Sequence, residues 1–573
     1  MQKHLKMLNN SQKKVALALT DNTIVSASPG TGKTKTLVAR AQRKLVTLPK
    51  HKKLALITYT NAAADEISDR LNAGSNEAFI GTIHRFCLEF ILRPFGWIYH
   101  WNKPRVVAFG DLQTFLQENQ QIQLGENPID ELNKLKKTID GELDLSVEWD
   151  NVSPIKNVAE LYYAFLESKK AIDFNEILYR SYKLISENEF IRQSLANKFY
   201  EIAIDEFQDT NIFQYEIFKA IGAFNLCTFF IVGDEKQRIY AFTGAIENAF
   251  ERASADFGSE IHLLDTTYRS TNNIVAAYSC LFENHPKLEN ESEYKDTDIN
   301  IVFGRTTNDT NNKYIENCIN WLIENKIPLS EIAILTRSWR DAYFISQYLR
   351  TKFHVVGMGA LPHKSSPTSS FTLLKSISRF LVSSNIKHLR SIKRNLEFHV
   401  LENNLSLSEK EQSYALNNMI ALIKRVEPEA SLIDGLQQIK DVFDAVFKTS
   451  HSDLEELISQ IQSEEGKLWT LDKYIKTIAG VDGVTINTIH QAKGLEYEAV
   501  ILNNVSENKI PFQQYLGRRG SDYLYANLTK ENLTAGRTLL YVGVSRAKRV
   551  LIITHGYKQS MFLPAIAATN SKG

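Results

Sequence analysis

The sequence predicts an α/β protein with two cores of parallel strands, each interrupted by a mainly helical insertion. A glycine-rich loop stands between an expected strand and an expected helix near the N-terminus, and two carboxylates end another apolar strand far downstream. A second series of strand-like segments alternates with helical ones in the C-terminal half. The 573 residues leave room for this architecture, because they correspond to two to four domains at about 150 residues each.

Composition excludes several classes of protein. The 43% apolar and 23% charged residues are typical of a globular protein, not of disorder, collagen or coiled coil. The net charge of +1 neither favours nor excludes nucleic acid, because a local basic groove can bind a polyanion. The widely spaced cysteines indicate a reducing compartment and exclude a Cys-rich zinc site. Apolar runs are strand-sized and the N-terminus lacks a signal peptide, so we expect a cytoplasmic protein without a membrane partner.

The first chemical motif is a phosphate-binding loop after the expected strand Thr23–Ser26. Its residues are Ala27, Ser28, Pro29, Gly30, Thr31, Gly32, Lys33 and Thr34. Lys33 is expected to reach the β- and γ-phosphates of a nucleotide, and the Thr34 hydroxyl to bind Mg²⁺. Ala27 stands where the usual pattern has its first glycine. The alternative is a chance glycine-rich turn, which the flanking strand and helix disfavour.

Two carboxylates follow the expected strand Tyr200–Ile204. Asp205 and Glu206 would lie at the carboxyl end of this strand, where parallel sheets bind ligands. We expect Asp205 to hold Mg²⁺ through water and Glu206 to orient or deprotonate the attacking water. The alternative is a solvated acidic turn.

A third cluster follows the expected strand Phe229–Val232. Gln237 could sense a γ-phosphate by hydrogen bonding, and Tyr240 and Phe242 offer faces for stacking. Aromatic residues after a strand are more often part of the core, so this signal is weak by itself.

The spacing of the motifs predicts the domain organisation. The stretch between Lys33 and Asp205 is far longer than a few βα units require, so a subdomain is inserted there. Strand signals in the C-terminal half are likewise interrupted by amphipathic helical spacing after a Ser- and Pro-rich linker. The expected divisions are 1–90 with 171–260 for the first core, 91–170 for its insertion, 261–357 with 481–573 for the second core, and 358–480 for its insertion.

The ordered motifs resemble those of superfamily 1A DNA helicases of the UvrD/Rep/PcrA type. The matching segments are Leu8–Gln12 (Q motif), Thr58–Glu66 (Ia), Gly81–Cys87 (Ib), Asp173–Phe174 (the DF element), Asp205–Thr210 (II), Gly233–Ala245 (III), Thr267–Ser270 (IV), Gly483–Tyr497 (V) and Tyr541–Lys548 (VI). The resemblance spans both ends of the chain. It implies two RecA-like cores that enclose ATP, with Mg²⁺ as the second cofactor.

The resemblance also implies roles for individual residues. Gln12 would read adenine, Tyr268 would stack on it and Glu496 would hold the ribose. Arg269 and Arg546 would approach the γ-phosphate as arginine fingers. The residues expected to contact DNA are Tyr59, Thr82, His84, Tyr240, Phe242, Thr488 and His490.

The function implied is that of an ATP-dependent 3′→5′ translocase and helicase acting on single-stranded and tailed duplex DNA in repair or replication restart. The alternative is an ATP-driven DNA-binding sensor that regulates a separate nuclease or ATPase subunit, as in compact UvrD-like proteins of Gabija-type phage defence. Three positions depart from the family pattern: Thr243 replaces an arginine, Thr267 replaces an asparagine, and Ala535-Gly536 replaces an acidic pair. Arg238, on the same loop as Thr243, is a candidate substitute for the missing arginine.

Overall fold

The computed structural model describes residues 7–570 except 19–20, 72–73, 75, 102–103, 108, 126, 150, 241–243, 298–300, 308, 364–367, 384–385, 404, 406, 462–467 and 520–521. The chain divides into two compact units. The first comprises Met1–Tyr268 with Lys287–Glu291, and the second Arg269–Pro286 with Ser292–Gly573. No helix within the described ranges is both long and apolar enough to cross a bilayer.

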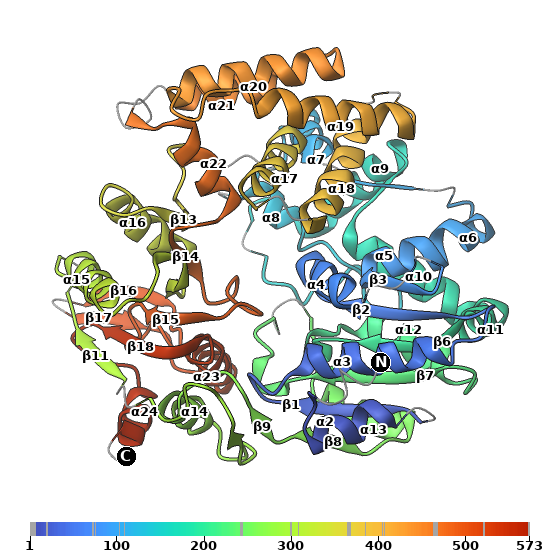
Figure 1. The fold of residues 1–573 in the computed structure, drawn as a ribbon. Coiled ribbons are helices and arrows are strands. Elements are labelled where there is room, and N and C mark those ends of the chain that lie inside the picture. The colour runs from blue at the N-terminus through green and yellow to red at the C-terminus, as the bar shows by residue number, and fades with distance from the viewer. Residues whose placement is uncertain are drawn as a thin grey trace. The chain divides into compact units, whose positions relative to one another are not determined.

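The first unit is built on a six-stranded sheet in the order β3-β2-β6-β7-β1-β8, in which all neighbours are parallel (Figure 1). The strands are β1 (Thr23–Ala27), β2 (Lys53–Thr58), β3 (Ala78–Thr82), β6 (Phe199–Ile204), β7 (Thr228–Gly233) and β8 (Ile261–Leu264). The inner strands are mostly apolar and buried along nearly their whole length, because helices cover both faces of a parallel sheet. The carboxyl ends of these strands therefore meet at one edge.

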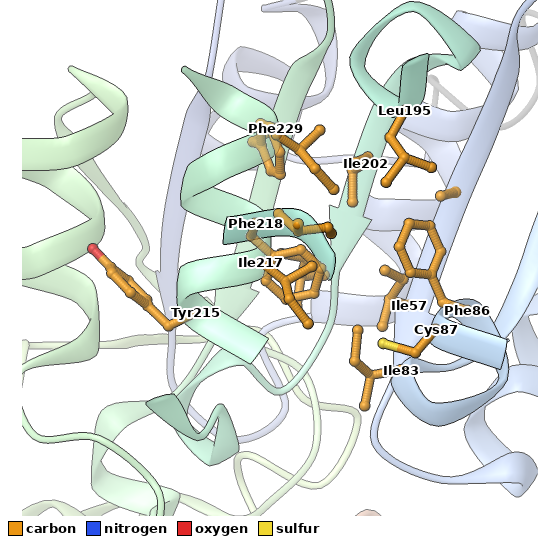
Figure 2. Close-up of a cluster of buried hydrophobic side chains, with 14 of the residues drawn as sticks. Ile57, Ile83, Phe86, Cys87, Leu195, Ile202, Tyr215, Ile217, Phe218 and Phe229 are labelled. Atoms are coloured by element: carbon orange, nitrogen blue, oxygen red, sulfur yellow. The ribbon is translucent and has the colours of Figure 1, made fainter. Parts of the chain in front are cut away.

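Helices on both faces bury this sheet. They are α2 (Asn10–Leu17), α3 (Lys33–Val46), α4 (Asn61–Leu71), α5 (Ile83–Cys87), α10 (Phe174–Glu187), α11 (Glu189–Lys198), α12 (Ile212–Gly222) and α13 (Ala249–Phe257). One side of the core is drawn in Figure 2, where the labelled residues are Ile57, Ile83, Phe86, Cys87, Leu195, Ile202, Tyr215, Ile217, Phe218 and Phe229. Figure 2 also shows the Tyr215 hydroxyl pointing away from the cluster, and it donates to Asp256 at 2.6 Å.

The insertion of the first unit is mainly helical and has its own small apolar core around Phe115 and Tyr162. Its elements are η1 (Leu88–Leu92), α6 (Arg93–Phe95), η2 (Gly96–Tyr99), β4 (Arg105–Val106), α7 (Phe109–Glu118), α8 (Pro128–Leu132), α9 (Ile155–Ser168) and β5 (Ala171–Ile172). An ion pair of 2.7 Å between Lys137 and Glu176 joins the insertion to α10.

The second unit contains another six-stranded parallel sheet, in the order β11-β18-β15-β12-β14-β13. The strands are β11 (Val302–Arg305), β12 (Ile332–Thr336), β13 (Val355–Gly357), β14 (Val484–Thr488), β15 (Tyr497–Leu502) and β18 (Ala547–His555). The helices beside it are α14 (Asn272–Ser279), α15 (Asn311–Glu324), η6 (Leu329–Glu331), α16 (Trp339–Leu349), α23 (Lys530–Val544) and α24 (Leu563–Asn570). A separate hairpin of β16 (Tyr515–Arg519) and β17 (Asp522–Tyr525) precedes α23.

A helical insertion separates β13 from β14. Its helices are α17 (Ser369–Ser383), α18 (Ile386–Glu402), α19 (Glu409–Ile423), α20 (Leu432–Phe447), α21 (Ser452–Gln460) and α22 (Leu471–Ala479). They share one apolar core, which includes Leu373, Met419 and Phe443.

The expected fold class is confirmed, since both units have a parallel six-stranded sheet interrupted by a mainly helical insertion. Two details differ from expectation. The apolar run Phe79–Ile83 predicts a strand that includes Ile83, but Ile83 opens helix α5, because Thr82 caps that helix through its side chain. Strand β8 pairs with β1, so the first unit continues to Tyr268, beyond the expected division after residue 260.

Candidate nucleotide and DNA sites

The phosphate loop leaves β1 and turns into α3 through two glycines. Gly30 and Gly32 have φ angles of +75° and +81°, a left-handed conformation that favours glycine. A Cβ atom on Gly32 would lie 2.6 Å from Nε2 of Gln12, so a larger residue also lacks space there. The backbone therefore curls at the N-terminus of α3, which is the arrangement that binds phosphate oxygens.

Side chains of the loop hold its shape. Thr31 Oγ1 donates to the Ser28 carbonyl at 2.8 Å, and both residues are buried. The Lys33 ammonium donates to the Ala27 carbonyl at 2.9 Å. Lys33 and Thr34 begin α3 and are partly exposed, so an ammonium and a hydroxyl are presented where the helix N-terminus favours negative charge.

Gln12, on helix α2, hydrogen-bonds to the phosphate loop. With Asn9 it forms a capping box at the start of α2, in which its Oε1 accepts from the Asn9 N–H at 3.1 Å. Its Nε2 donates to the Thr31 carbonyl at 2.8 Å, and its side chain is fully buried. The structure thus brings Gln12 against the phosphate loop, and its adenine contact stays a prediction.

The end of the loop contacts the last segment of the first unit. Thr267 Oγ1 donates to the Pro29 carbonyl at 3.0 Å, and the Tyr268 N–H donates to the Gly30 carbonyl at 2.9 Å. The Tyr268 ring is 40% exposed, which leaves a face for stacking. Thr267, noted in the sequence only as a departure from the family, therefore supports the loop directly.

The two carboxylates lie at the carboxyl end of β6, as the motif predicts. Burial raises the pKa of Asp205, the adjacent charge of Glu206 raises it further, and Lys33 opposes both effects. A cation beside this pair would favour the ionised form, which is the form that binds Mg²⁺. Glu206 has a φ of +53°, a conformation that costs a non-glycine residue about 1–3 kcal/mol and is typical of functional sites.

A chain of hydrogen bonds connects Glu206 to Gln237. Gln208 Nε2 donates to Glu206 Oε2, and Gln208 Oε1 accepts from the Asp234 N–H at 2.9 Å. Gln237 Nε2 then donates to Asp234 Oδ2 at 2.8 Å, and the Gln237 side chain is 2% exposed. Gln208, Asp234 and Gln237 are buried, so this chain holds the partly buried Glu206 carboxylate in a fixed polar network.

Two expected DNA contacts lie together. The rings of Tyr59, after β2, and Tyr240, after η4 (Glu235–Gln237), stack with centroids 5.1 Å apart and an interplanar angle of 22°. Tyr59 is 40% exposed. Phe242 and Thr243 lie outside the described residues.

Another expected DNA contact in this unit, His84, is partly buried. Its ring meets Phe174 edge-on at 5.1 Å, and burial lowers its pKa to about 4, so the ring is neutral at physiological pH. Thr82 accepts from the Arg85 N–H at 3.4 Å as the cap of α5. Both residues lie at the carboxyl end of β3, on the same sheet edge as the carboxylates.

In the second unit, Arg269 and Arg546 meet through Ser545. Arg269 donates to the Ser545 carbonyl at 3.1 Å, and Arg546 to the Ser545 hydroxyl at 2.9 Å. Arg269 also forms an ion pair of 2.7 Å with Glu496, which Lys548 approaches at 3.2 Å. Burial opposes ionisation of Glu496, but the charges of Arg269 and Lys548 outweigh it, so its pKa is lowered. Three predicted nucleotide residues of this unit therefore form one charged cluster.

Thr488 and His490 follow β14. The Thr488 hydroxyl accepts from the Gln491 N–H at 3.3 Å and is nearly buried. Burial lowers the pKa of His490, and the charges of Arg337 and Lys493 lower it further. This end of β14 is therefore positively charged, as a phosphate-contacting surface requires.

The residues present fit Mg²⁺ with a nucleotide. Among the described residues, no group of three or more His, Cys, Asp and Glu side chains could hold a metal ion by itself. Mg²⁺ typically takes one or two protein oxygens and completes its shell with phosphate and water. Thr34 and Asp205 offer that kind of donor set.

Sequence reasoning missed Gln208, Asp234 and Thr267 as parts of the site. Asp234 comes directly after β7, and the rule applied to Asp205 would have found it. Gln208 and Thr267 lie in the segments matched to motifs II and IV, but their contacts with Asp234 and Pro29 join residues distant in sequence and gave no local signal.

Together, the loop, the carboxylates and the parallel sheet define the first unit as a P-loop nucleotide-binding core. Comparison with known proteins identifies the family of the chain. Residues 8–258 match the UvrD/REP helicase N-terminal domain, and residues 262–479 and 375–558 match the UvrD-like helicase C-terminal domain. These matches cover more than half of the chain, which therefore belongs to the UvrD/REP helicase family.

Relatives align along nearly the whole length. The chain is 26% identical to a probable DNA helicase II homolog of Rickettsia conorii, over 99% of this chain and 95% of the relative. It is 24% identical to DNA helicase II of Escherichia coli over 97% of this chain and 85% of the relative. It is 22% identical to the ATP-dependent DNA helicase Rep of E. coli over 96% of this chain and 90% of the relative.

Proposed function

We propose that this protein is an ATP-dependent DNA helicase or translocase that moves 3′→5′ along single-stranded DNA. The observation that carries the proposal is the joint presence of Lys33, Asp205 and Glu206 on one phosphate-binding core, with a stacked tyrosine pair on the same unit. Family membership and the names of the relatives support the DNA substrate. The polarity rests on the family resemblance.

In this proposal each residue has a defined task in hydrolysis. Lys33 binds the phosphates, and Thr34 and Asp205 hold Mg²⁺, which would neutralise charge on the transferring phosphoryl group. Glu206 orients and deprotonates the attacking water, and Gln237 responds to the γ-phosphate. Arg269 and Arg546 stabilise the transition state. Gln12, Tyr268 and Glu496 bind the nucleoside.

DNA contacts are proposed for Tyr59, Tyr240, Phe242, Thr82, His84, Thr488 and His490. The tyrosine pair supports this assignment best, because a partly exposed aromatic stack accepts bases regardless of sequence. A protein that moves along DNA must accept every base it meets, so this property suits the proposed function.

The test compares ATP hydrolysis and strand displacement by the purified protein on duplexes with a 3′ or a 5′ single-stranded tail. We expect hydrolysis to be stimulated by single-stranded DNA and only the 3′-tailed duplex to be unwound. Glu206→Gln should bind ATP but hydrolyse it at least about 100-fold more slowly. Glu216→Gln, a carboxylate change on α12, is the matched control and should behave like the parent.

The alternative function gives a different result. A DNA-binding subunit that regulates a separate nuclease would hydrolyse ATP on DNA but displace no strand by itself. Displacement of the 5′-tailed duplex alone would contradict the proposed polarity. Absence of DNA-stimulated hydrolysis would contradict both functions.

A further inference from the structure

A small cavity lies between the catalytic carboxylates and the tyrosine pair. Its volume is about 20 Å³, enough for one water molecule. The polar residues that line it are Thr58 and Tyr59 at the end of β2, Asp205, Glu206, Asp209 and Thr210 after β6, and Gln214 on α12. The cavity therefore joins a residue expected to contact DNA to residues expected to act on ATP.

Asp209 is the lining carboxylate to which no role has yet been assigned. It ends the short helix η3 (Phe207–Asp209), and its side chain is 4% exposed. Its N–H donates to the Glu206 carbonyl at 3.0 Å, so it closes the turn that holds Glu206 in its left-handed conformation. A displacement of Asp209 would change the backbone that aims the Glu206 carboxylate.

Asp209 is also close to the ring of Tyr240, the second member of the tyrosine pair. Burial raises the pKa of Tyr240, and the negative charges of Asp209 and then Glu206 raise it further. Tyr240 stacks on Tyr59, and Tyr59 lines the cavity with Asp209. Tyr59 therefore shares the cavity with Asp209, and Tyr240 experiences the negative charge of Asp209.

We propose that Asp209 is a positioning residue that transmits occupation of the Tyr59–Tyr240 pair by a DNA base to Glu206. A base that stacks on the pair shifts Tyr59 or Tyr240. The cavity wall shared with Asp209 then changes, and the η3 turn moves Glu206 toward the orientation that activates water. This inference rests on the proposed function and adds to it a route from DNA to ATP that runs through β2 and β6.

The decisive variant is Asp209→Asn, which keeps the shape and removes the charge. The ATPase rate is measured without DNA and across a titration with oligo-dT, and the affinity for oligo-dT is measured separately by fluorescence anisotropy. We expect the rate without DNA and the affinity to stay within about twofold of the parent, and the maximal stimulation by DNA to fall at least about fivefold. Asp209→Glu, which keeps the charge, should retain part of the stimulation.

Asp256→Asn is the matched control. Asp256 is a partly buried carboxylate of the same unit that accepts from the Tyr215 hydroxyl at 2.6 Å and does not line the cavity. Its variant should keep full stimulation. If Asp209→Asn does not fold, Thr210→Val removes a hydroxyl from the same cavity at nearly constant volume and should lower stimulation in the same way.

Each possible result either supports or contradicts the role proposed for Asp209. Full stimulation in Asp209→Asn, or an equal fall of the rates with and without DNA, overturns the role of Asp209 and leaves the proposed function intact. A parent protein without DNA-stimulated hydrolysis contradicts the proposed function itself. Selective loss of stimulation with unchanged DNA affinity supports the inference.

Discussion

At the scale of single residues, a buried cluster of charges joins α3 to β6. Arg40 on α3 and Glu201 on β6 form an ion pair of 2.8 Å, and Lys44 approaches the same carboxylate at 3.1 Å. Arg40 also donates to the carbonyls of Val15 and Ala18 at the end of α2. The cluster thus connects the three segments that carry Gln12, Lys33 and Asp205.

Removal of one partner should be costly, because the remaining charges stay buried without compensation. We expect Glu201→Ala to lower the free energy of unfolding by about 3–5 kcal/mol in chemical denaturation. The control is Glu66→Ala, which breaks a 2.7 Å pair with Arg70 on the exposed face of α4 and should cost about 0.3–0.5 kcal/mol. Similar losses in the two variants would show that Glu201 is not the centre of a buried network.

At the scale of elements, the helical insertion of the second unit contains a buried histidine pair. His399 on α18 and His451 before α21 stack at 5.2 Å, with their Nε2 atoms 3.2 Å apart. Ser369 on α17 contacts Nδ1 of His399 at 2.9 Å, and Asp444 on α20 contacts Nδ1 of His451 at 2.8 Å. Four segments of this insertion therefore meet through one polar chain.

The histidine pair should make the insertion sensitive to acid. Burial, followed by the neighbouring His451, lowers the pKa of His399 to about 4, whereas an unfolded histidine titrates near about 6.5. The folded state therefore binds fewer protons, and its stability should fall as the pH drops from about 6.5 to about 4, by at most about 3 kcal/mol. Thermal melting across this range measures the effect.

His399→Gln supplies the comparison, because glutamine can hydrogen-bond but does not titrate. Its melting temperature should depend less on pH than that of the parent between about pH 6.5 and 4. Identical pH profiles would exclude His399 as the source.

At the scale of the whole molecule, the question is how DNA and ATP are coupled. The family usually has an arginine at the position of Thr243, and threonine has neither its reach nor its bidentate donors. Arg238, the candidate substitute, donates to the Ile246 carbonyl at 3.0 Å and lies 3.5 Å from Glu247, so it is engaged in its own loop. The contact that an arginine at position 243 would supply should therefore be missing.

We therefore expect Thr243→Arg to raise both DNA-stimulated ATP hydrolysis and unwinding of a 3′-tailed duplex, by at least about fivefold if one coupling contact is restored. Single-turnover unwinding and steady-state hydrolysis measure the two effects. If the parent already unwinds DNA rapidly and the variant unwinds it no faster, the threonine at position 243 has no effect on coupling.

Much of this protein could be predicted from short stretches of sequence. The phosphate loop, the carboxylates of β6 and the two series of strands are local signals, because turn chemistry and strand periodicity involve residues close together in the chain. Local signals also placed Lys33, Thr34, Asp205 and Glu206 at strand ends and helix starts, which is where the structure has them.

Only the tertiary structure decided which distant residues meet. The pairing of β8 with β1 joins residues more than 200 positions apart and extends the first unit to Tyr268. The Arg40–Glu201 pair and the cavity beside Asp209 likewise depend on how neighbouring strands are ordered in the sheet. A single sequence carries no direct record of such contacts, because they arise when the packed core brings strand ends to a common edge. The motifs therefore predicted the candidate chemistry, and the contacts between their residues came from the fold.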